Sequence, residues 1–274
     1  MRKQGETGGE VRETHYQPKK KIKNRRKRIF VLLFFGILFA GILFCYYYTA
    51  DKETEKKFRQ LEETEEERER HTALPDSPDK KKNPDWIGWL KIRGTTVSYP
   101  VMQRDGAEEY YLHRDFDGNY SFYGTPFLDF RCSWDSDNAI VYGHNINGGR
   151  MFGALHAFDS RDFYVEHKEI ELRAGEKSRT YQVLAVIHTD TSSPLYYFTE
   201  TGNWEEYRDY VKTMIAGSLY RTELAGTVEK KMAEKNEEDF FRSYQFLTLS
   251  TCRTSAGRDK RLMIVAAKER TKED

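Results

Sequence analysis

The sequence holds little of what disulfide-rich, metal-binding or nucleotide-binding proteins need. It has three cysteines in 274 residues, which is too few for a disulfide scaffold. Cys45 lies in an apolar segment, so Cys132 and Cys252 remain as two thiols that could pair if they meet in space. The chain has no CxxC, HExxH or GxxxxGK spacing and no acidic cluster of the calcium-binding kind, so we expect no metal and no cofactor. A net charge of +1 argues against nucleic-acid binding.

The near-neutral total hides a strongly asymmetric N-terminus. Residues 1–28 end in a block of lysines and arginines, and residues 29–48, IFVLLFFGILFAGILFCYYY, carry no charge. A helix of that length spans roughly 30 Å, the thickness of a bilayer's hydrocarbon core. Thr49-Ala50-Asp51 is a poor cleavage site, so we expect an uncleaved signal anchor. The positive-inside rule then makes residues 1–28 a cytoplasmic tail, residues 29–48 a single transmembrane segment and the remainder extracellular.

Residues 49–84 connect this anchor to the folded part of the chain. Asp51 to Arg70 is nearly all charged, and opposite charges recur at the spacing that supports an exposed helix. Phe58 and Leu61 are its only large apolar residues, which is too few for a coiled-coil seam. We therefore expect a solvated helical stalk followed by a linker. If both serve only as a tether, a version of the chain that begins near Lys80 should keep its activity.

Residues 85–270 change to short apolar runs separated by turns. Two segments, 151–158 and 204–219, have helical apolar spacing, whereas most of the others alternate or are β-prone. The expected strands cover residues 86–92, 95–101, 121–130, 138–143, 169–172, 180–187, 244–249 and 262–267. Many short strands with little helix between them favour a mainly β fold, either a barrel or a sandwich, in one domain with a sizeable core.

Three residues at strand ends could form a catalytic site. Cys252 ends an apolar run and is followed by several cations, which favour the nucleophilic thiolate. His144 precedes a glycine-rich loop and could act as an acid or base, and Arg261 could stabilise an oxyanion with its fixed donors. Each also has an ordinary interpretation: a buried apolar cysteine, a structural histidine and a strand-edge cation.

The remaining histidines lack such a setting. His113, His156, His167 and His188 have neighbours that are typical of an ordinary strand or helix surface. We therefore expect them to be structural.

Several segments resemble the sortases, the cysteine transpeptidases of Gram-positive bacterial surfaces. The segment 248–252 (TLSTC), followed by 261–266 (RLMIVA), is similar to the sortase signature. The segment 142–145 (YGHN), with Met151-Phe152, is similar to their histidine segment. Agreement in order extends over about residues 83 to 268, and the long insert that carries the helix at 204–219 is similar to class B. The strand that follows Arg261, rather than Arg258, favours Arg261 as the matching arginine.

The resemblance implies a closed eight-stranded β-barrel with peripheral helices. It implies that Cys252 attacks a backbone carbonyl in a C-terminal sorting motif of a secreted protein, and that the thioacyl enzyme is resolved by an amine of a peptidoglycan precursor or a pilin. His144 matches the acid and base, and Arg261 the residue that steadies the oxyanion. The resemblance assigns the substrate groove to Ser250, Thr251 and Leu112, and places the reading of the motif near the loop at Leu195-Tyr196.

Two alternatives remain open. A cell-wall L,D-transpeptidase or cysteine hydrolase also uses exported cysteine and histidine, but it prefers a glycine before the cysteine and a histidine shortly upstream, and Thr251 and the distant His144 fit this poorly. A non-catalytic surface ectodomain would keep Cys252 buried or paired with Cys132. Reaction of Cys252 with a thiol reagent would separate an enzyme from such a binding domain.

Overall fold

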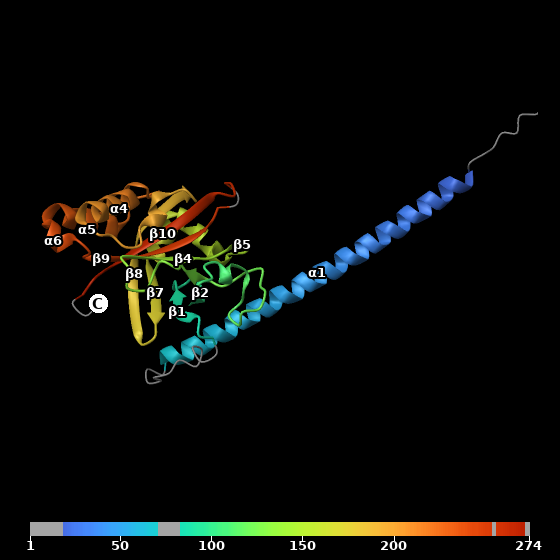
Figure 1. Ribbon diagram of the computed structural model, residues 1–274, viewed down its shortest axis with the longest axis horizontal. Helices are drawn as coiled ribbons and strands as arrows, with labels where there is room; N and C mark the ends of the chain where they lie inside the picture. The colour runs from blue at the N-terminus through green and yellow to red at the C-terminus, as the bar shows by residue number, and fades with distance from the viewer. Residues whose placement is uncertain (1–18, 71–82, 254–255, 272–274) are drawn as a thin grey trace, which may run out of the picture. The chain divides into compact units, whose positions relative to one another are not determined.

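The computed structural model describes residues 19–70, 83–253 and 256–271. The expected linker at 71–82 and the first part of the basic tail lie outside these ranges. The chain divides into two compact units, residues 1–52 and 53–274. Helix α1 (Lys19–Arg70) contributes to both units (Figure 1).

The N-terminal unit contains the apolar part of α1. This stretch is long and apolar enough to cross a membrane, by length and composition. Its large side chains are exposed, Phe30 by 72% and Ile37 by 73%. Exposed leucine, isoleucine and phenylalanine over this length are stable in lipid and unfavourable in water.

The larger unit is built on a closed barrel with the strand order β1-β2-β3-β4-β9-β10-β8-β7. This confirms the mainly β fold and the eight-stranded barrel that the resemblance implies. Neighbouring strands are antiparallel except for β2 with β3 and β4 with β9. The barrel strands are β1 (Trp86–Lys91), β2 (Ser98–Met102), β3 (Phe127–Leu128), β4 (Asn138–Tyr142), β7 (Glu169–Ala174), β8 (Lys177–Asp190), β9 (Tyr244–Cys252) and β10 (Lys260–Glu269).

Alternation along β9 divides its side chains between two cores. Leu247 and Leu249 pack in the barrel interior, whereas Tyr244 and Phe246 pack in a second core outside the barrel. Because successive side chains of a strand point to opposite faces, Cys252 at the end of β9 belongs to the outer face.

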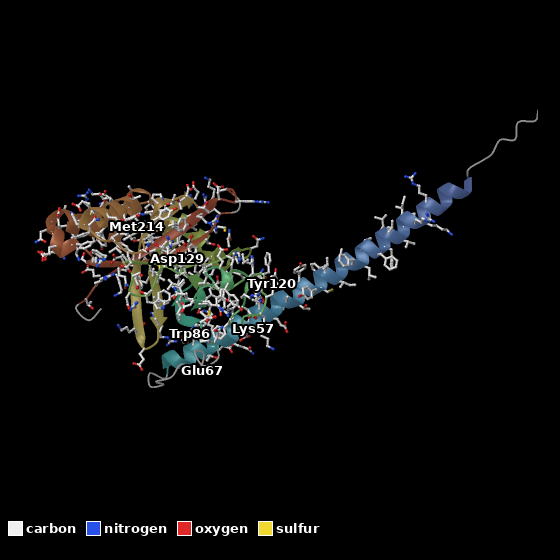
Figure 2. The ribbon with its side chains drawn as sticks, viewed as in Figure 1. Lys57, Glu67, Trp86, Tyr120, Asp129 and Met214 are labelled. Carbon is white, nitrogen blue, oxygen red and sulfur yellow. The ribbon has the colours of Figure 1, made fainter. Side chains whose placement is uncertain are left out.

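Helices cover that outer face (Figure 1). Met214 of α4 is buried in the outer core with residues of α5 and α6 (Figure 2). The expected helix at 204–219 is confirmed, although it ends at Ala216, whereas α5 and α6 were not expected. The helical elements of this unit are η1 (Tyr110–His113), η2 (Phe152–Asp159), α3 (Arg161–Glu166), η3 (Pro194–Tyr197), α4 (Trp204–Ala216), α5 (Glu223–Glu234) and α6 (Glu237–Phe240).

A short hairpin lies beside the barrel. It is formed by β5 (Asn145–Ile146) and β6 (Arg150–Met151), with the Gly148-Gly149 turn between them. Both glycines have positive φ angles, 78° and 72°, which residues with a Cβ rarely adopt. The glycine-rich loop of the sequence is therefore the turn of this hairpin.

The end of α1 differs from the expected solvated stalk. Phe58 packs edge-on against Tyr99 with ring centroids 5.3 Å apart, and Leu61 packs on another cluster of the barrel unit. Lys57 donates to Asp115 at 2.7 Å, and the buried Glu65 pairs with Arg173. The two apolar residues that were too few for a coiled coil lie three positions apart, on one helix face, and that face is covered by the barrel.

Candidate active site

Cys252 is the last residue of β9 and is partly exposed. Its partner in the antiparallel register with β10 is Arg261. Residues directly opposite each other on neighbouring strands project to the same face of a sheet, so the thiol and the guanidinium share the outer face. Arg258 lies instead on the connection between the two strands. The register thus favours Arg261 over Arg258 as the arginine of the site.

The two other cysteines neither pair with Cys252 nor share its setting. All three are unpaired, so the disulfide between Cys132 and Cys252 that a binding ectodomain would use is not formed. Cys132 is buried in the barrel interior, and burial raises the pKa of its thiol to about 12. That thiol stays protonated near neutral pH and is therefore a poor nucleophile.

His144 follows β4 and is held by a backbone carbonyl. Its Nε2 lies 2.8 Å from the carbonyl oxygen of Leu112. A carbonyl only accepts, so Nε2 carries the proton and the neutral ring keeps its lone pair on Nδ1. Burial lowers the pKa of His144 and nearby His113 lowers it further, while the bond to Leu112 acts in the opposite direction. The neutral, acid–base-competent form is therefore favoured near neutral pH.

The chain reaches His144 through a close contact at Gly143. A Cβ added at Gly143 would lie 2.6 Å from the ring of Phe152, so only glycine fits here without displacement. Phe152 also donates its backbone N–H to the carbonyl of His144 at 2.9 Å. The histidine is thus fixed from its backbone as well as from its ring.

The three residues expected to bind substrate, Ser250, Thr251 and Leu112, do not share one face. The Ser250 hydroxyl lies 2.8 Å from the Tyr196 hydroxyl, and Ser250 shares the outer face with Cys252. Thr251 projects to the opposite face and donates to the carbonyl of Gly143 at 2.8 Å. Leu112 is half-buried and contributes the carbonyl that holds His144.

Tyr196 lies in the loop where the resemblance places the reading of the sorting motif, but the sequence did not predict its contacts. Its ring stacks on Tyr142 with centroids 6.2 Å apart, and burial raises the pKa of its hydroxyl. Tyr142 donates to Asp129 at 2.8 Å, and Arg131 bonds both Asp129 and the Tyr196 carbonyl. Ser250 and these residues form a connected polar network on the outer face beside Cys252.

The sequence did not predict the roles of His156 and Asn145. His156 was expected to be an ordinary surface histidine, yet its Nε2 lies 3.1 Å from the carbonyl oxygen of Cys252. Asn145 donates its side-chain amide to the same oxygen at 2.9 Å. His113 is exposed at the end of η1, as expected, and its ring lies 5.4 Å from that of His144. Contacts between residues about a hundred positions apart leave no local signal in the sequence.

Arg261 is anchored by the backbone of the loop before it. Its Nη1 donates to the carbonyl of Arg258 at 2.8 Å and to that of Lys260 at 3.0 Å. Among the described residues there is no group of three His, Cys, Asp or Glu that could hold a metal ion. The groups that could take part in chemistry near the end of β9 are the partly exposed thiol of Cys252, the imidazole of His144 and the guanidinium of Arg261.

Comparison with known proteins points to one family. A family model of the sortase domain matches residues 90–269. The chain is 31% identical to sortase B of Listeria monocytogenes over 195 residues, which cover 70% of this chain and 72% of that protein. It is 26% identical to sortase B of Staphylococcus aureus over 244 residues, 87% of this chain and 93% of that protein. A solved complex of Staphylococcus aureus sortase B with a substrate matches with a TM-score of 0.68 and 25% identity, covering 81% of this chain and 99% of that chain.

Proposed function

The chain belongs to the sortase family as a class B-like member, and we propose that Cys252, His144 and Arg261 carry out its reaction. Sortases are cysteine transpeptidases that cleave a sorting motif and pass the acyl group to an amine, and this chain is such an enzyme. The observation that carries the residue assignment is the register of β9 and β10, which places Arg261 opposite the partly exposed Cys252.

In the first half of the reaction, the Cys252 thiol passes its proton to neutral His144, and the resulting thiolate attacks a backbone carbonyl of the sorting motif. A C–S bond forms and the carbonyl oxygen becomes an oxyanion. Nη1 of Arg261 bonds two backbone carbonyls. Its Nε and Nη2 donors have no hydrogen-bond partner among the described residues and can stabilise that charge. The C–N bond then breaks as the imidazolium form of His144 protonates the leaving amine, and a thioester remains on the enzyme.

In the second half, an acceptor amine attacks the thioester. Neutral His144 takes its proton as the new C–N bond forms, and the C–S bond breaks to return the thiolate. The lowered pKa of His144 favours the neutral base that this step requires. We propose a peptidoglycan-precursor or pilin amine as the acceptor.

We propose that the surface beside the thiol takes the sorting motif. Tyr196 is half-buried on the outer face with Cys252 and can contact the substrate there. Ser250 is only 2% exposed, so it acts through its hydrogen bond to the Tyr196 hydroxyl. Leu112 can contact the substrate through a side chain that is half-exposed. Thr251 serves differently, since its hydroxyl bonds the carbonyl of Gly143 and so fixes the segment that leads to His144.

Helix α1 anchors the enzyme in a membrane. We propose that residues 29–48 span the bilayer once, with the basic residues before them in the cytoplasm and the catalytic unit outside. Support comes from the apolar composition of the helix and from its exposed side chains. The two flanks also differ in charge, since residues 19–28 are basic without an acidic residue, whereas residues 51–70 mix both signs. The sorting motif of a secreted protein would be presented on that same outer side.

Trapping the thioacyl intermediate tests the residue assignment. The purified chain is incubated with a library of sorting-motif peptides without an amine acceptor, and adducts are identified by mass spectrometry. We expect the adduct on Cys252, its loss in Cys252→Ala together with all transpeptidation, and an unchanged result in Cys132→Ala. Peptide cleavage that survives in Cys252→Ala would overturn the assignment, and absence of any adduct or product from the native chain would point to a binding ectodomain.

A further inference from the structure

We infer that Asn145 and His156 are positioning residues that fix the nucleophile by holding its own backbone carbonyl. This inference rests on the proposed role of Cys252. Asn145 Nδ2 lies 2.9 Å from the Cys252 oxygen and His156 Nε2 lies 3.1 Å from it. A carbonyl oxygen has two lone pairs, so these two donors complete its hydrogen bonding.

The strand pairing explains why this carbonyl needs side-chain partners. Arg253 donates its N–H to the carbonyl of Lys260 at 2.9 Å, so 253 and 260 form a hydrogen-bonded pair. In an antiparallel ladder the next pair, Cys252 with Arg261, is then of the non-bonded kind. The backbone groups of Cys252 consequently point away from β10, toward the side on which β4 lies.

On that side the ladder has already ended. The last rung joins Gly143 N to the carbonyl of Ser250 at 3.1 Å, and β4 stops at Tyr142. A continuing parallel strand would place a backbone N–H near the carbonyl of Cys252, two residues further on. The chain instead turns into the β5-β6 hairpin, and the amide of Asn145 and the imidazole of His156 take the place of the missing rung.

The two donors couple the nucleophile to its acid–base partner. Asn145 directly follows His144, so one bond joins the His144 segment to Cys252. His156 reaches the same oxygen from η2, whose residues Leu155 and Phe158 are fully buried in the barrel interior. The Asn145 bond therefore fixes the separation of the His144 segment from Cys252, and the His156 bond connects Cys252 to the buried core.

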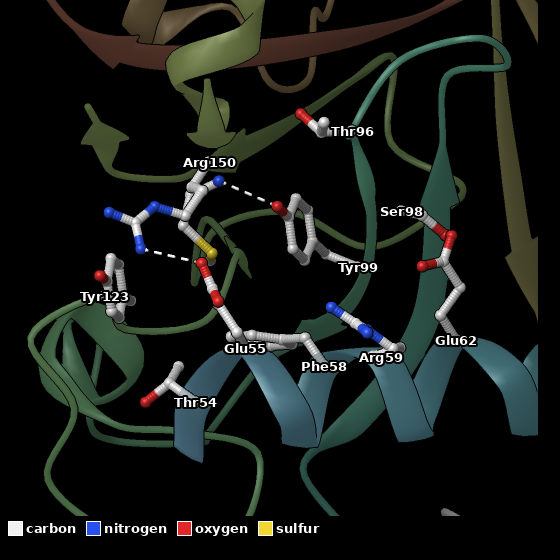
Figure 3. Close-up of a pocket in the computed structure, with 11 residues that line it drawn as sticks. Thr54, Glu55, Phe58, Arg59, Glu62, Thr96, Ser98, Tyr99, Tyr123 and Arg150 are labelled. Carbon is white, nitrogen blue, oxygen red and sulfur yellow. Dashed lines mark hydrogen bonds and ion pairs between the residues drawn. The ribbon is translucent and has the colours of Figure 1, made fainter. Parts of the chain in front are cut away.

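The hairpin that carries Asn145 is itself held from behind. The backbone N–H of Met151 donates to the Tyr99 hydroxyl at 2.9 Å, and Arg150 pairs with Glu55 of α1 at 3.1 Å (Figure 3). Asn145 is the partner of Met151 in the β5-β6 pair. The amide that bonds Cys252 thus projects from a supported backbone, as a positioning group requires.

Loss of either donor frees the end of β9 and the thiol on it. Misplacement by about 1 Å can lower a rate on the order of 100-fold. Each single variant keeps one of the two hydrogen bonds to the Cys252 carbonyl, so we expect a smaller loss. We expect His156→Leu and Asn145→Asp each to lower kcat roughly 10-fold, with KM changed less than about twofold, because the groove residues are untouched. His156→Gln keeps a side-chain N–H donor and should recover most of kcat.

The test uses the full chain in detergent, with a sorting peptide that the native enzyme processes and an amine acceptor. kcat, KM and the alkylation rate of Cys252 are measured beside thermal unfolding, and kcat is corrected for the folded fraction. His167→Leu is the matched control, since His167 bonds the backbone carbonyl of Arg93 at 2.9 Å, remote from the thiol. If His156→Leu does not fold, Asn145→Asp, which has nearly the same shape, tests the same oxygen.

The double variant should lose less than the product of the two single losses, because both donors act on one atom. Unchanged kcat in both single variants would overturn the inference, as would losses that only follow the folded fraction or that His156→Gln fails to recover. Failure of the proposed function is a separate result, in which the native chain forms no thioacyl adduct at Cys252.

Discussion

Phe58→Ala is the sharpest test of whether the end of α1 is part of the catalytic unit or only a tether. We consider a version of the chain that begins at Glu53, where the second compact unit starts. Phe58 is half-buried against the barrel interior and lies edge-on to Tyr99 at 5.3 Å. Half-burial of such a ring contributes about 1–1.5 kcal/mol, and the aromatic pair about 0.5–1.5 kcal/mol more.

The expected loss is therefore about 2 kcal/mol. For a unit of this size that corresponds to a fall in Tm of roughly 4–8 °C, measured by circular dichroism during heating. Gln60→Ala is the matched control, because Gln60 lies on the exposed face of the same helix and its substitution should leave Tm within about 1 °C. A version beginning near Lys80 lacks the helix entirely and should unfold at a lower temperature than the Phe58→Ala variant.

Equal melting of all four proteins would refute this reasoning. It would restore the expectation from the sequence that residues 49–84 set access to the substrate and nothing else. Activity provides a second readout, because Arg150 of the β5-β6 hairpin pairs with Glu55 and loses that partner in the version that begins near Lys80. We expect that version to turn over more slowly even below its unfolding temperature.

Three further predictions concern the site and its support. Burial alone would raise the pKa of Asp129, but hydrogen bonds from Arg131 and others lower that pKa. The resulting stabilisation is present above the pKa of the unfolded chain and is lost as pH falls through the pKa of the folded state. Arg131→Met should therefore lower the free energy of unfolding by about 2 kcal/mol at pH 7, measured in urea, and by markedly less near pH 3. His113→Gln removes a neighbouring charge and should raise the pKa of His144 in an NMR titration; an unchanged value would contradict the coupling. Gly143→Ala forces a Cβ against an aromatic ring and should cost about 1–3 kcal/mol of stability together with kcat, whereas an unchanged kcat would show that His144 tolerates the shift.

Part of the site could be predicted because its signals are local. Cys252 and Arg261 lie at facing ends of two consecutive strands, so an antiparallel connection brings them together whatever the remainder of the chain does. The prediction of a membrane-spanning segment at 29–48 is also local, since it rests only on the length and composition of that run.

The contacts that hold the site in place could not be read in this way. The carbonyl of Leu112 bonds His144, and backbone groups look alike at every position of a sequence. His156 lies on a short helix whose residues are otherwise ordinary, and only the closed barrel brings it to Cys252. Such contacts depend on the path of the whole chain.

Other omissions had a signal that was present but weak. In α5, Leu224, Val228 and Met232 recur every four residues, and Thr222 caps the helix by accepting from the N–H of Ala225. Alanine, glycine and threonine between them give the segment little apolar contrast. At the end of α1, Phe58 and Leu61 are too few to form a seam with another helix, but the surface that covers them belongs to the barrel.

The position of β9 between β4 and β10 has a consequence for how activity first appears. β9 pairs in parallel with β4, and bonds such as that from Thr251 to Gly143 join residues 108 positions apart. Contacts of such long range close large loops and form slowly. Until they form, the chain carries a cysteine without its imidazole, so transpeptidation should appear only with barrel closure and would report the final step of folding.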